Sequence, residues 1–293
     1  MRLLIFTDVD GTLIDFATYE PGPATGALER CRRLGVPVIP VTSKSAVEIV
    51  RLRSRLGLEA PFAVENGAAI WVPVTDPVAS AAGSLAGERD IPADTRDGYL
   101  RVVSGTPRAE LVAGLDDVLS GLGVENRSLS AMTTEEVAER TGLGSAAAAA
   151  AADREFSEPF LLLREGRMLT PDERIALFPE LEMRARERGL TCLLGGRFFH
   201  LLGVHNKGTA VRFLIEAYRR SLAAGEPPPL TMALGDAPND GDMLAVVDHP
   251  VLIARPDGTH ASLFRLAGLE RVDGIGPAGW AVAVSARLDA LGD

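Results

Sequence analysis

The sequence predicts an α/β protein with a parallel sheet and an inserted second domain. Short apolar runs alternate with helical patterns over residues 3–72, and the same alternation returns from residue 207 onward. Residues 98–200 lie between these two parts and have a mixed strand and helix pattern. Strands that alternate with helices form parallel sheets with right-handed crossovers. The expected architecture is therefore a Rossmann-like core over residues 1–84 and 204–293, interrupted by an α+β cap over residues 85–203.

The first part of the chain predicts a β-α-β-α-β order. Apolar runs predict strands at residues 3–7, 36–41 and 62–64, and helical spacing predicts helices at residues 24–34 and 43–57. Pro23 and Gly35 stand just inside the start and just past the end of the first helix, as they commonly do. Asn66-Gly67 separates the third strand from residues 69–72 and predicts a hairpin turn.

The middle of the chain is less regular. Residues 74–97 are rich in Ala, Gly, Asp and Pro, which predicts a linker or a surface loop. Beyond it, the patterns predict strands at residues 99–103, 160–163 and 198–202, and helices near residues 107–121 and 133–140. Seven consecutive alanines end at Ala152, and they predict a helix because alanine is the best helix former.

The last part returns to strand and helix alternation. We expect a helix over residues 207–221, strands at residues 231–234 and 251–253, and a final helix over residues 277–290. A proline-rich loop at residues 225–229 precedes the first of these strands.

Composition excludes several classes of protein. The net charge of -10 disfavours binding to nucleic acid or to an anionic membrane. No run of about 18 apolar residues predicts a spanning helix, and the apolar start is too short for a signal peptide. Cys31 and Cys192 have no partner at zinc-ligand spacing and predict buried thiols. We expect a soluble, cytoplasmic protein.

Two acidic segments follow predicted strands. Asp8-Val9-Asp10-Gly11-Thr12 follows the first strand, and Gly235-Asp236-Ala237-Pro238-Asn239-Asp240 follows a late one. Both segments are expected at the edge of the sheet where its strands have their carboxyl ends. Open α/β sheets bind ligands at that edge, and paired carboxylates there suit Mg²⁺. The first segment is not a calcium loop, because its glycine is at the fourth position, but an ordinary acidic turn remains an alternative. Helix capping remains an alternative for Asn239 or Asp240.

Two further segments carry groups that bind anions. Thr42-Ser43-Lys44 follows the second strand, where hydroxyls and a helix N-terminus favour an anion, although Ser43 could be a plain N-cap. Lys207 opens a helix, a position that the helix dipole disfavours for a cation, which hints at a role beyond structure. A surface lysine is the alternative. No P-loop or dinucleotide-binding fingerprint is present.

These four motifs, in this order, resemble the signature of the haloacid dehalogenase-like phosphatases. Within that superfamily, the chain is similar to the mannosyl-3-phosphoglycerate phosphatases and their glucosyl-3-phosphoglycerate relatives. The similarity is carried by residues 40–44, 64–68, 154–160, 195–200 and 206–208. It spans most of the chain but does not account for residues 74–97 or for the alanine tract.

The resemblance implies an Mg²⁺-dependent phosphatase that acts through an aspartyl-phosphate. It makes Asp8 the nucleophile and Asp10 the acid and base, with Thr42 and Lys207 binding the phosphoryl group. It makes Asp8, Asp10, Asp236 and Asp240 the metal-site residues, with Asp10 contributing its backbone carbonyl. Asp240 would support the site through the metal's waters or by a hydrogen bond to Lys207. Another sugar phosphatase and a phosphomutase of the same fold remain alternatives. A binding protein and a glycosyltransferase are disfavoured by the complete set of motifs.

The implied substrate is a small phosphorylated sugar acid, and the implied role is the synthesis of mannosylglycerate, a compatible solute. A guanidinium matches a carboxylate in bidentate geometry, so Arg197 is the candidate for the glycerate group. The other candidate substrate-binding residues are Ser43, Lys44, Glu65, Asn66, Gly67, His200 and Asn239, and Glu158 is a weaker candidate. The state of assembly is expected to be a monomer or a homodimer, and no nucleic-acid or membrane partner is expected.

Overall fold

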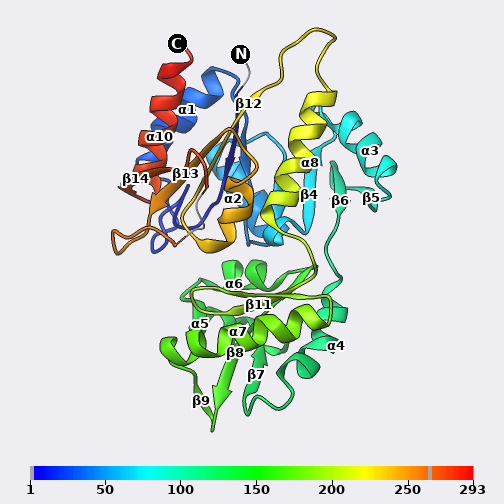
Figure 1. The fold of residues 1–293 in the computed structure, drawn as a ribbon, viewed down its shortest axis with the longest axis vertical. Helices are drawn as coiled ribbons and strands as arrows, with labels where there is room; N and C mark the ends of the chain where they lie inside the picture. The colour runs from blue at the N-terminus through cyan, green and yellow to red at the C-terminus, as the bar shows by residue number, and fades with distance from the viewer. Residues whose placement is uncertain (1–2, 263–265, 293) are drawn as a thin grey trace. The chain divides into compact units, whose positions relative to one another are not determined.

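A computed structural model describes residues 3–262 and 266–292 of the chain (Figure 1). The chain divides into two compact units. Unit 1 comprises Met1–Ser43, Arg53–Val103 and Asn206–Asp293, and unit 2 comprises Lys44–Leu52 and Ser104–His205. Helix α2 (Ala46–Leu56) passes from one unit into the other along the chain.

Unit 1 is built on a parallel sheet with the strand order β14-β13-β12-β1-β2. Its strands are β1 (Leu3–Thr7), β2 (Val38–Pro40), β12 (Leu230–Gly235), β13 (His249–Ala254) and β14 (Glu270–Ile275). Strand β3 (Phe62–Val64) continues the parallel order beyond β2 through a bridge between Val41 and Ala63. Thr7 pairs with Leu234 of β12 and with Pro40 of β2, so these three strands end level with one another.

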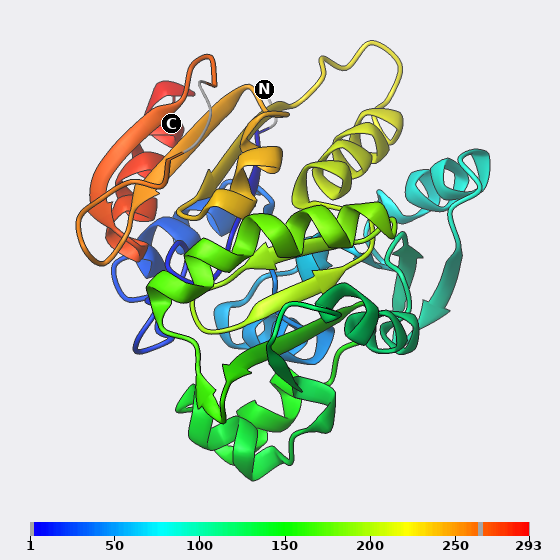
Figure 2. The same ribbon diagram turned by 60° about the horizontal axis from the view of Figure 1, so that its bottom comes forward.

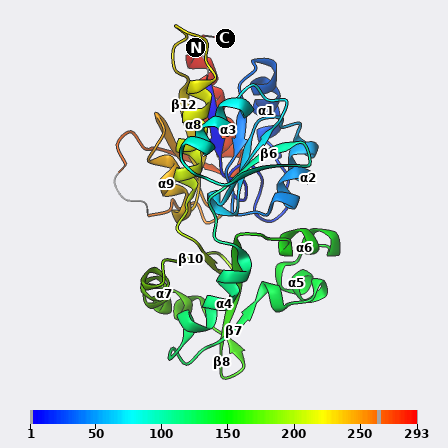
Figure 3. The same ribbon diagram turned by 90° about the vertical axis from the view of Figure 1, so that its right-hand side faces the viewer.

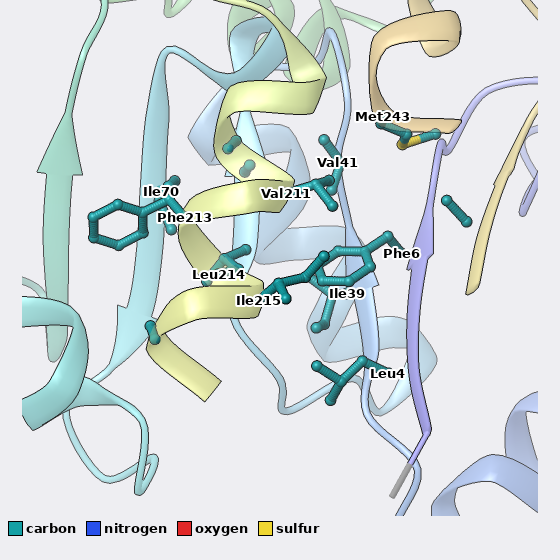
Figure 4. Packing of buried hydrophobic residues seen from close by; sticks show 14 of the residues in the cluster. Leu4, Phe6, Ile39, Val41, Ile70, Val211, Phe213, Leu214, Ile215 and Met243 are labelled. Carbon is teal, nitrogen blue, oxygen red and sulfur yellow. The ribbon is translucent and has the colours of Figure 1, made fainter. Parts of the chain in front are cut away.

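Helices cover both faces of this sheet because successive side chains of a strand point to opposite faces. On one face, Leu4 and Phe6 pack in a cluster with α8 (Lys207–Arg220) and α9 (Gly241–Leu244), as Figure 4 shows for several of these residues. On the other face, the Trp280 indole of α10 (Pro277–Ala290) donates to the hydroxyl of Thr7. Helix α10, red in Figure 2, packs on β13 and β14 and against α1 (Ala24–Arg33).

A second, antiparallel sheet of unit 1 has the order β3-β4-β6-β5. Its further strands are β4 (Ala69–Pro73), β5 (Ala93–Arg96) and β6 (Tyr99–Val103). Between β4 and β5 lies helix α3 (Ala79–Glu88), whose Ala82, Leu85 and Ala86 are buried in the core of unit 1. The predicted linker at residues 74–97 is therefore wrong. Small residues predicted a loop, but packing against the sheet stabilises a helix there.

The boundaries of the middle segment lie later in the sequence than predicted. Residues Lys44–Leu52, predicted in the core, belong to unit 2. The first boundary of the middle segment lies between Val103 and Ser104, instead of before residue 85, because β6 pairs with β4 of unit 1 and β5 pairs with β6. The second division lies between His205 and Asn206, close to the predicted one.

Unit 2 contains an antiparallel sheet with the order β10-β11-β8-β7. Its strands are β7 (Glu125–Ser128), β8 (Ser157–Arg164), β10 (Thr191–Leu194) and β11 (Phe199–Leu202), and β9 (Arg167–Met168) pairs with β8. Helices α4 (Arg108–Leu119) and α7 (Pro171–Glu187) share a buried apolar cluster with the sheet. Helices α5 (Thr134–Thr141) and α6 (Ser145–Ala152) lie side by side (Figure 3).

In the part of the chain that the structure describes, there are also three short 3₁₀ turns: η1 (Glu65–Gly67), η2 (Leu129–Ala131) and η3 (Pro238–Asp240). The α/β class and the helices at residues 24–34, 145–152, 207–221 and 277–290 are confirmed within a residue or so at their ends. Helix α7 and strand β14 were not predicted. Cys31 and Cys192 are buried free thiols, as expected. Among the described residues, no helix combines the length and the apolar character needed to cross a bilayer.

The packing of α10 against the chain that precedes it can be tested at Gly279. Gly279 is the third residue of α10, and a Cβ there would lie 2.2 Å from the carbonyl oxygen of Gly274. Gly26 is the third residue of α1, is exposed, and a Cβ there would meet nothing within 4 Å. We expect Gly279→Ala to lower the free energy of unfolding by about 1–3 kcal/mol through overpacking. Gly26→Ala should leave it unchanged or raise it by up to about 1 kcal/mol.

Urea denaturation of both variants and of the parent chain measures the difference. Equal stability of the two alanine variants would contradict the close approach of Gly279 to Gly274.

Candidate active site

The candidate site lies at the carboxyl ends of β1 and β12. After β1 the chain proceeds to β2 on one side, and it later returns to β12 on the other side of β1. This reversal makes the crevice between the ends of β1 and β12 a topological switch point, where open α/β sheets bind ligands. Asp8 directly follows β1, and Asp236 directly follows β12.

Three buried carboxylates and one buried ammonium meet there. Oxygen atoms of Asp8, Asp236 and Asp240 all lie within 4.8 Å of one another. The Nζ atom of Lys207 lies 2.5 Å from Oδ1 of Asp8 and 2.7 Å from Oδ1 of Asp240. Lys207 is only 1% exposed, so this charge is withdrawn from water and held by its two carboxylate partners. The surface-lysine alternative for Lys207 is excluded.

Hydrogen bonds of Asp240 and Thr12 fix the loop that follows β12. Oδ2 of Asp240 accepts from the backbone N–H groups of Asp236 at 3.0 Å and Ala237 at 2.9 Å. Asp240 therefore caps its own loop with one oxygen and binds Lys207 with the other. The hydroxyl of Thr12 donates to Oδ1 of Asp236 at 2.9 Å and joins this loop to the turn after β1.

Gly11 allows the two acidic loops to approach. Its φ is +78°, and a Cβ there would lie 2.9 Å from Oδ2 of Asp236. A side chain at this position would therefore collide with a carboxylate of the cluster and would also be strained. The glycine of the first motif is explained by this close approach.

The electrostatics follow from burial and from proximity. Burial raises the pKa of Asp8 well above its usual value, and Asp240 and Asp236 raise it further, whereas the Lys207 ammonium opposes them. Burial together with Asp240 raises the pKa of Asp236 to about 7. Burial alone would lower the pKa of Lys207, but Asp240 and Asp8 outweigh it, so that pKa is raised. The ammonium form of Lys207 is the stable one.

The cluster has the chemistry of a divalent-cation site. Hard carboxylate oxygens are the ligands that Mg²⁺ prefers in proteins. Three carboxylates face a single ammonium, which leaves an excess of negative charge that a divalent cation would neutralise. Asp8 and Asp236 are the residues available to hold Mg²⁺, because Asp240 is already engaged by Lys207 and by two backbone donors.

Asp10 follows β1, and Thr42 and Ser43 follow β2, the neighbouring strand of the sheet. Asp10 is partly buried in the turn after β1 and adds to the negative potential at Asp236. Thr42 is fully buried and directly follows Val41, whose N–H donates to the carbonyl of Thr7 at the end of β1. Ser43 is not the N-cap of α2. That role belongs to Ser45, whose hydroxyl accepts from the N–H of Glu48.

A buried turn and the late loop are joined by a side-chain hydrogen bond. The Nδ2 atom of Asn239 donates to Oδ1 of Asn66 at 3.0 Å. Asn66 belongs to η1 together with Glu65 and Gly67, and all three are buried. Asn66-Gly67 does connect two antiparallel strands, β3 and β4, as predicted.

Three predicted substrate-binding residues lie in unit 2. The Nζ atom of Lys44 donates to Glu48 at 3.2 Å. The guanidinium of Arg197 is exposed and donates to the backbone carbonyls of Arg140 and Thr141 at the end of α5. His200 lies on β11, and its Nδ1 atom is buried without a hydrogen-bond partner among the described residues.

Glu158 is fully buried and has structural partners within unit 2. Its carboxylate accepts from the Arg108 guanidinium at 2.6 Å and from the N–H of Ser130 at 2.9 Å. This ion pair accounts for Glu158 without a ligand.

Two side chains at the site had no predicted role, Thr12 and Trp280. Thr12 binds Asp236, and its place in the first motif was the signal that could have identified it. Trp280 donates to the Thr7 hydroxyl, which itself donates to the carbonyl of Asp8 at 2.6 Å. No local sequence pattern links Trp280 to Asp8, because the contact joins opposite ends of the chain.

Comparisons with known proteins identify the family of the chain. A family model described as haloacid dehalogenase-like hydrolase matches residues 5–81. The chain is 33% identical to a glucosyl-3-phosphoglycerate/mannosyl-3-phosphoglycerate phosphatase of Methanococcoides burtonii, over 100% of this chain and 98% of the relative. It is also 33% identical to a protein of the same name from Persephonella marina, over 95% and 94% of the two chains.

A solved structure is similar in fold. A haloacid dehalogenase-like hydrolase from Bacteroides thetaiotaomicron superposes with a TM-score of 0.58, at 15% identity, over 98% of this chain and 100% of the other.

The environment of His200 gives a test by pH. Burial, together with the charges of Arg154 and Arg174, lowers the pKa of His200 to about 3. We expect its NMR signal, identified among the four histidines by its loss in His200→Gln, not to titrate between pH 8 and pH 5 in the folded protein. In urea the same signal should titrate near the ordinary value of about 6.5.

Between pH 6.5 and pH 3 only the unfolded chain would then bind this proton. His200 therefore contributes a loss of stability as the pH falls through that window. A midpoint above pH 5 in the folded protein would contradict the buried, neutral imidazole.

Proposed function

Because the chain belongs to the haloacid dehalogenase-like hydrolases and is a phosphatase, we propose that it hydrolyses glucosyl-3-phosphoglycerate or mannosyl-3-phosphoglycerate with Asp8 as the nucleophile. The substrate class is that named for the two relatives. The observation that carries the proposal is the convergence of Asp8, Asp236, Asp240 and Lys207 at the switch point of the sheet.

In the first step, a carboxylate oxygen of Asp8 attacks the phosphorus atom. The bond from phosphorus to the glycerate oxygen breaks, and its electron pair leaves with that oxygen. Asp10, two residues further on and outside the carboxylate cluster, donates a proton to the leaving oxygen. The products of this step are the glycosylglycerate and an aspartyl-phosphate on Asp8.

In the second step, Asp10 takes a proton from a water molecule, and the water oxygen attacks the phosphorus of the aspartyl-phosphate. The bond from phosphorus to the Asp8 oxygen breaks, which returns the carboxylate and releases inorganic phosphate. One carboxyl group serves as acid and then as base, because the first step leaves it deprotonated.

The cationic and hydroxyl groups bind the phosphoryl oxygens. Lys207 favours the ionised form of Asp8 through their ion pair, in opposition to burial, and would place its charge beside the phosphoryl group. Thr42 would donate its hydroxyl to another phosphoryl oxygen. Mg²⁺, held by Asp8, Asp236 and the backbone carbonyl of Asp10, would neutralise phosphate charge.

Selectivity for the sugar acid is assigned to the other predicted substrate-binding residues. Arg197 would bind the glycerate carboxylate with the guanidinium N–H groups that do not reach α5. Ser43, Lys44 and His200 are further candidates. Glu65, Gly67 and Asn239 are the remaining candidates for binding the substrate.

The nucleophile can be tested directly. Asp8→Asn should lower kcat for phosphate release by about 10⁴-fold or more, because an amide is a very weak nucleophile. Asp242→Asn is the matched control: Asp242 is exposed and lies only two residues beyond Asp240. Release of inorganic phosphate from both glycosyl-3-phosphoglycerates, with and without Mg²⁺, is the measurement. Near-normal turnover by Asp8→Asn at an unchanged melting temperature would refute the assignment.

The role of Arg197 in binding the substrate carboxylate can be tested by comparing two substrates. Arg197→Ala should raise KM about tenfold or more for the glycerate substrate, and less for p-nitrophenyl phosphate, which has no carboxylate. Arg188→Ala is the control, since Arg188 also donates to a helix carbonyl in unit 2 and is exposed. Equal effects of Arg197→Ala on both substrates would show that Arg197 only stabilises α5.

A further inference from the structure

The turn between β3 and β4 is held in an unfavourable backbone conformation. Glu65, Asn66 and Gly67 have φ values of +49°, +61° and +92°, so three consecutive residues lie in the left-handed region. Asparagine tolerates this region and glycine favours it, but for glutamate it is costly. All three residues are buried. Such a conformation persists only where the surrounding contacts hold it, and it is common at functional sites.

The turn contacts three segments that carry groups of the active site. The N–H of Asn66 donates to the carbonyl of Thr42 at 2.8 Å. The side chain of Asn66 accepts from Asn239, which lies between Asp236 and Asp240. The backbone of Gly67 packs against Asn206, the N-cap of α8 and the neighbour of Lys207, so closely that a Cβ would lie 2.4 Å from the Asn206 carbonyl oxygen.

Each of these segments comes from a different part of the chain. Thr42 follows β2, the loop of Asp236 and Asp240 follows β12, and Lys207 opens α8. Thr42 and Asn239 are each joined to the turn by one hydrogen bond, and Asn206 is in direct contact with it. A displacement of the turn would therefore move all three segments together.

We infer that the Glu65–Gly67 turn is a positioning element of the phosphatase site, and that Asn66 is a positioning residue acting through Asn239 on the loop of Asp236 and Asp240. The inference rests on the proposed function for the roles of those two aspartates. It changes the predicted role of Asn66, whose side-chain oxygen is used by Asn239 and not by a sugar hydroxyl.

The side-chain chemistry explains why an asparagine suits this position. A neutral carbonyl oxygen accepts the Asn239 amide without adding charge. An aspartate could accept the same hydrogen bond, but it would bring another carboxylate close to the loop that carries Asp236 and Asp240. Asparagine also adopts the left-handed conformation that the turn requires.

The main test removes the Asn66–Asn239 hydrogen bond from each side. Asn66→Gly keeps the backbone conformation and loses the amide, and Asn239→Ala loses the donor. We expect each variant to lower kcat for p-nitrophenyl phosphate about tenfold and to raise the Kd of Mg²⁺ about tenfold, as loss of an outer hydrogen bond does at metal sites. The Kd is measured by calorimetry with MgCl₂ and no substrate.

The double variant separates the possible roles of Asn66. If Asn66 acts through Asn239, the double variant should be no worse than either single variant, because both remove the same bond. If the two effects multiply to about a hundredfold, the residues act independently and the inference fails. It also fails if Asn66→Gly raises only KM for the sugar substrate, since that result identifies a sugar ligand.

A control for the backbone is present in the same unit. Asp97 has a φ of +52° and precedes Gly98 in the turn between β5 and β6, and both are exposed. Asp97→Gly should leave kcat and the Kd of Mg²⁺ unchanged. If Asn66→Gly lowers the melting temperature and leaves kcat and the Kd of Mg²⁺ unchanged, the turn has only a structural role, and the inference is overturned.

A glycine pair tests the contact with α8. Gly67 and Gly98 have similar φ values, +92° and +82°, but a Cβ at Gly98 would meet nothing within 4 Å. Both alanine variants are strained, and only Gly67→Ala pushes on Asn206. We expect Gly67→Ala to lower kcat at least tenfold more than Gly98→Ala. Equal effects would count against the contact.

These outcomes are distinct from a failure of the proposed function. An Asp8→Asn variant that stayed active would refute the nucleophile whatever the Asn66 variants do. A parent enzyme that hydrolysed p-nitrophenyl phosphate but no glycosyl-3-phosphoglycerate would refute the substrate and leave the positioning test intact.

Discussion

The structure of the core depends on one constraint, the burial of three carboxylates around a single ammonium. Asp8, Asp236 and Asp240 are all less than 10% exposed, and Lys207 is almost completely buried. Removing a partner from such a cluster leaves an uncompensated buried charge, which is strongly destabilising. The segments that carry these groups must therefore be held together by the rest of the fold. Level strand ends, the close approach of Gly11 and the hydrogen bond of Thr12 provide this restraint.

Sequence patterns predicted most elements of the parallel core, but not β14, because those elements have their own local signals. Buried parallel strands such as Leu3–Thr7 are continuous apolar runs, and α10 follows a glycine and begins with a proline. The signals failed where stability comes from tertiary packing. The Ala-rich helix α3 depends on contacts with the second sheet, and α7 contains Pro179 within its length. Composition alone indicated a loop for the first and gave no clear pattern for the second.

The contrast between local signals and tertiary contacts also applies to the site. Asp8 and Asp236 could be placed together from the sequence, because the carboxyl ends of parallel strands meet at one edge of the sheet. A hydrogen bond from Lys207 to Asp240 was one of the two roles that the family resemblance implied for Asp240, and it is present. The ion pair of Lys207 with Asp8 was not predicted, since it depends on how far the N-terminus of α8 reaches into the cluster. The Asn66–Asn239 hydrogen bond was equally hidden. Asn66-Gly67 is explained locally as a hairpin turn, and a satisfied local explanation gives no reason to look for a distant partner.

In the proposed mechanism, the buried lysine also explains how an acidic protein can bind a phosphate ester. With a net charge of -10, the chain as a whole repels an anionic substrate, so the attraction has to be local. The ammonium of Lys207 has three N–H groups, and among the described residues two of them are used by Asp8 and Asp240. One donor therefore remains for a phosphoryl oxygen. The surrounding low-dielectric environment strengthens that contact, whereas a lysine on the surface would be screened by water and salt. Burial thus gives one cation an influence that the net charge of the chain would otherwise cancel.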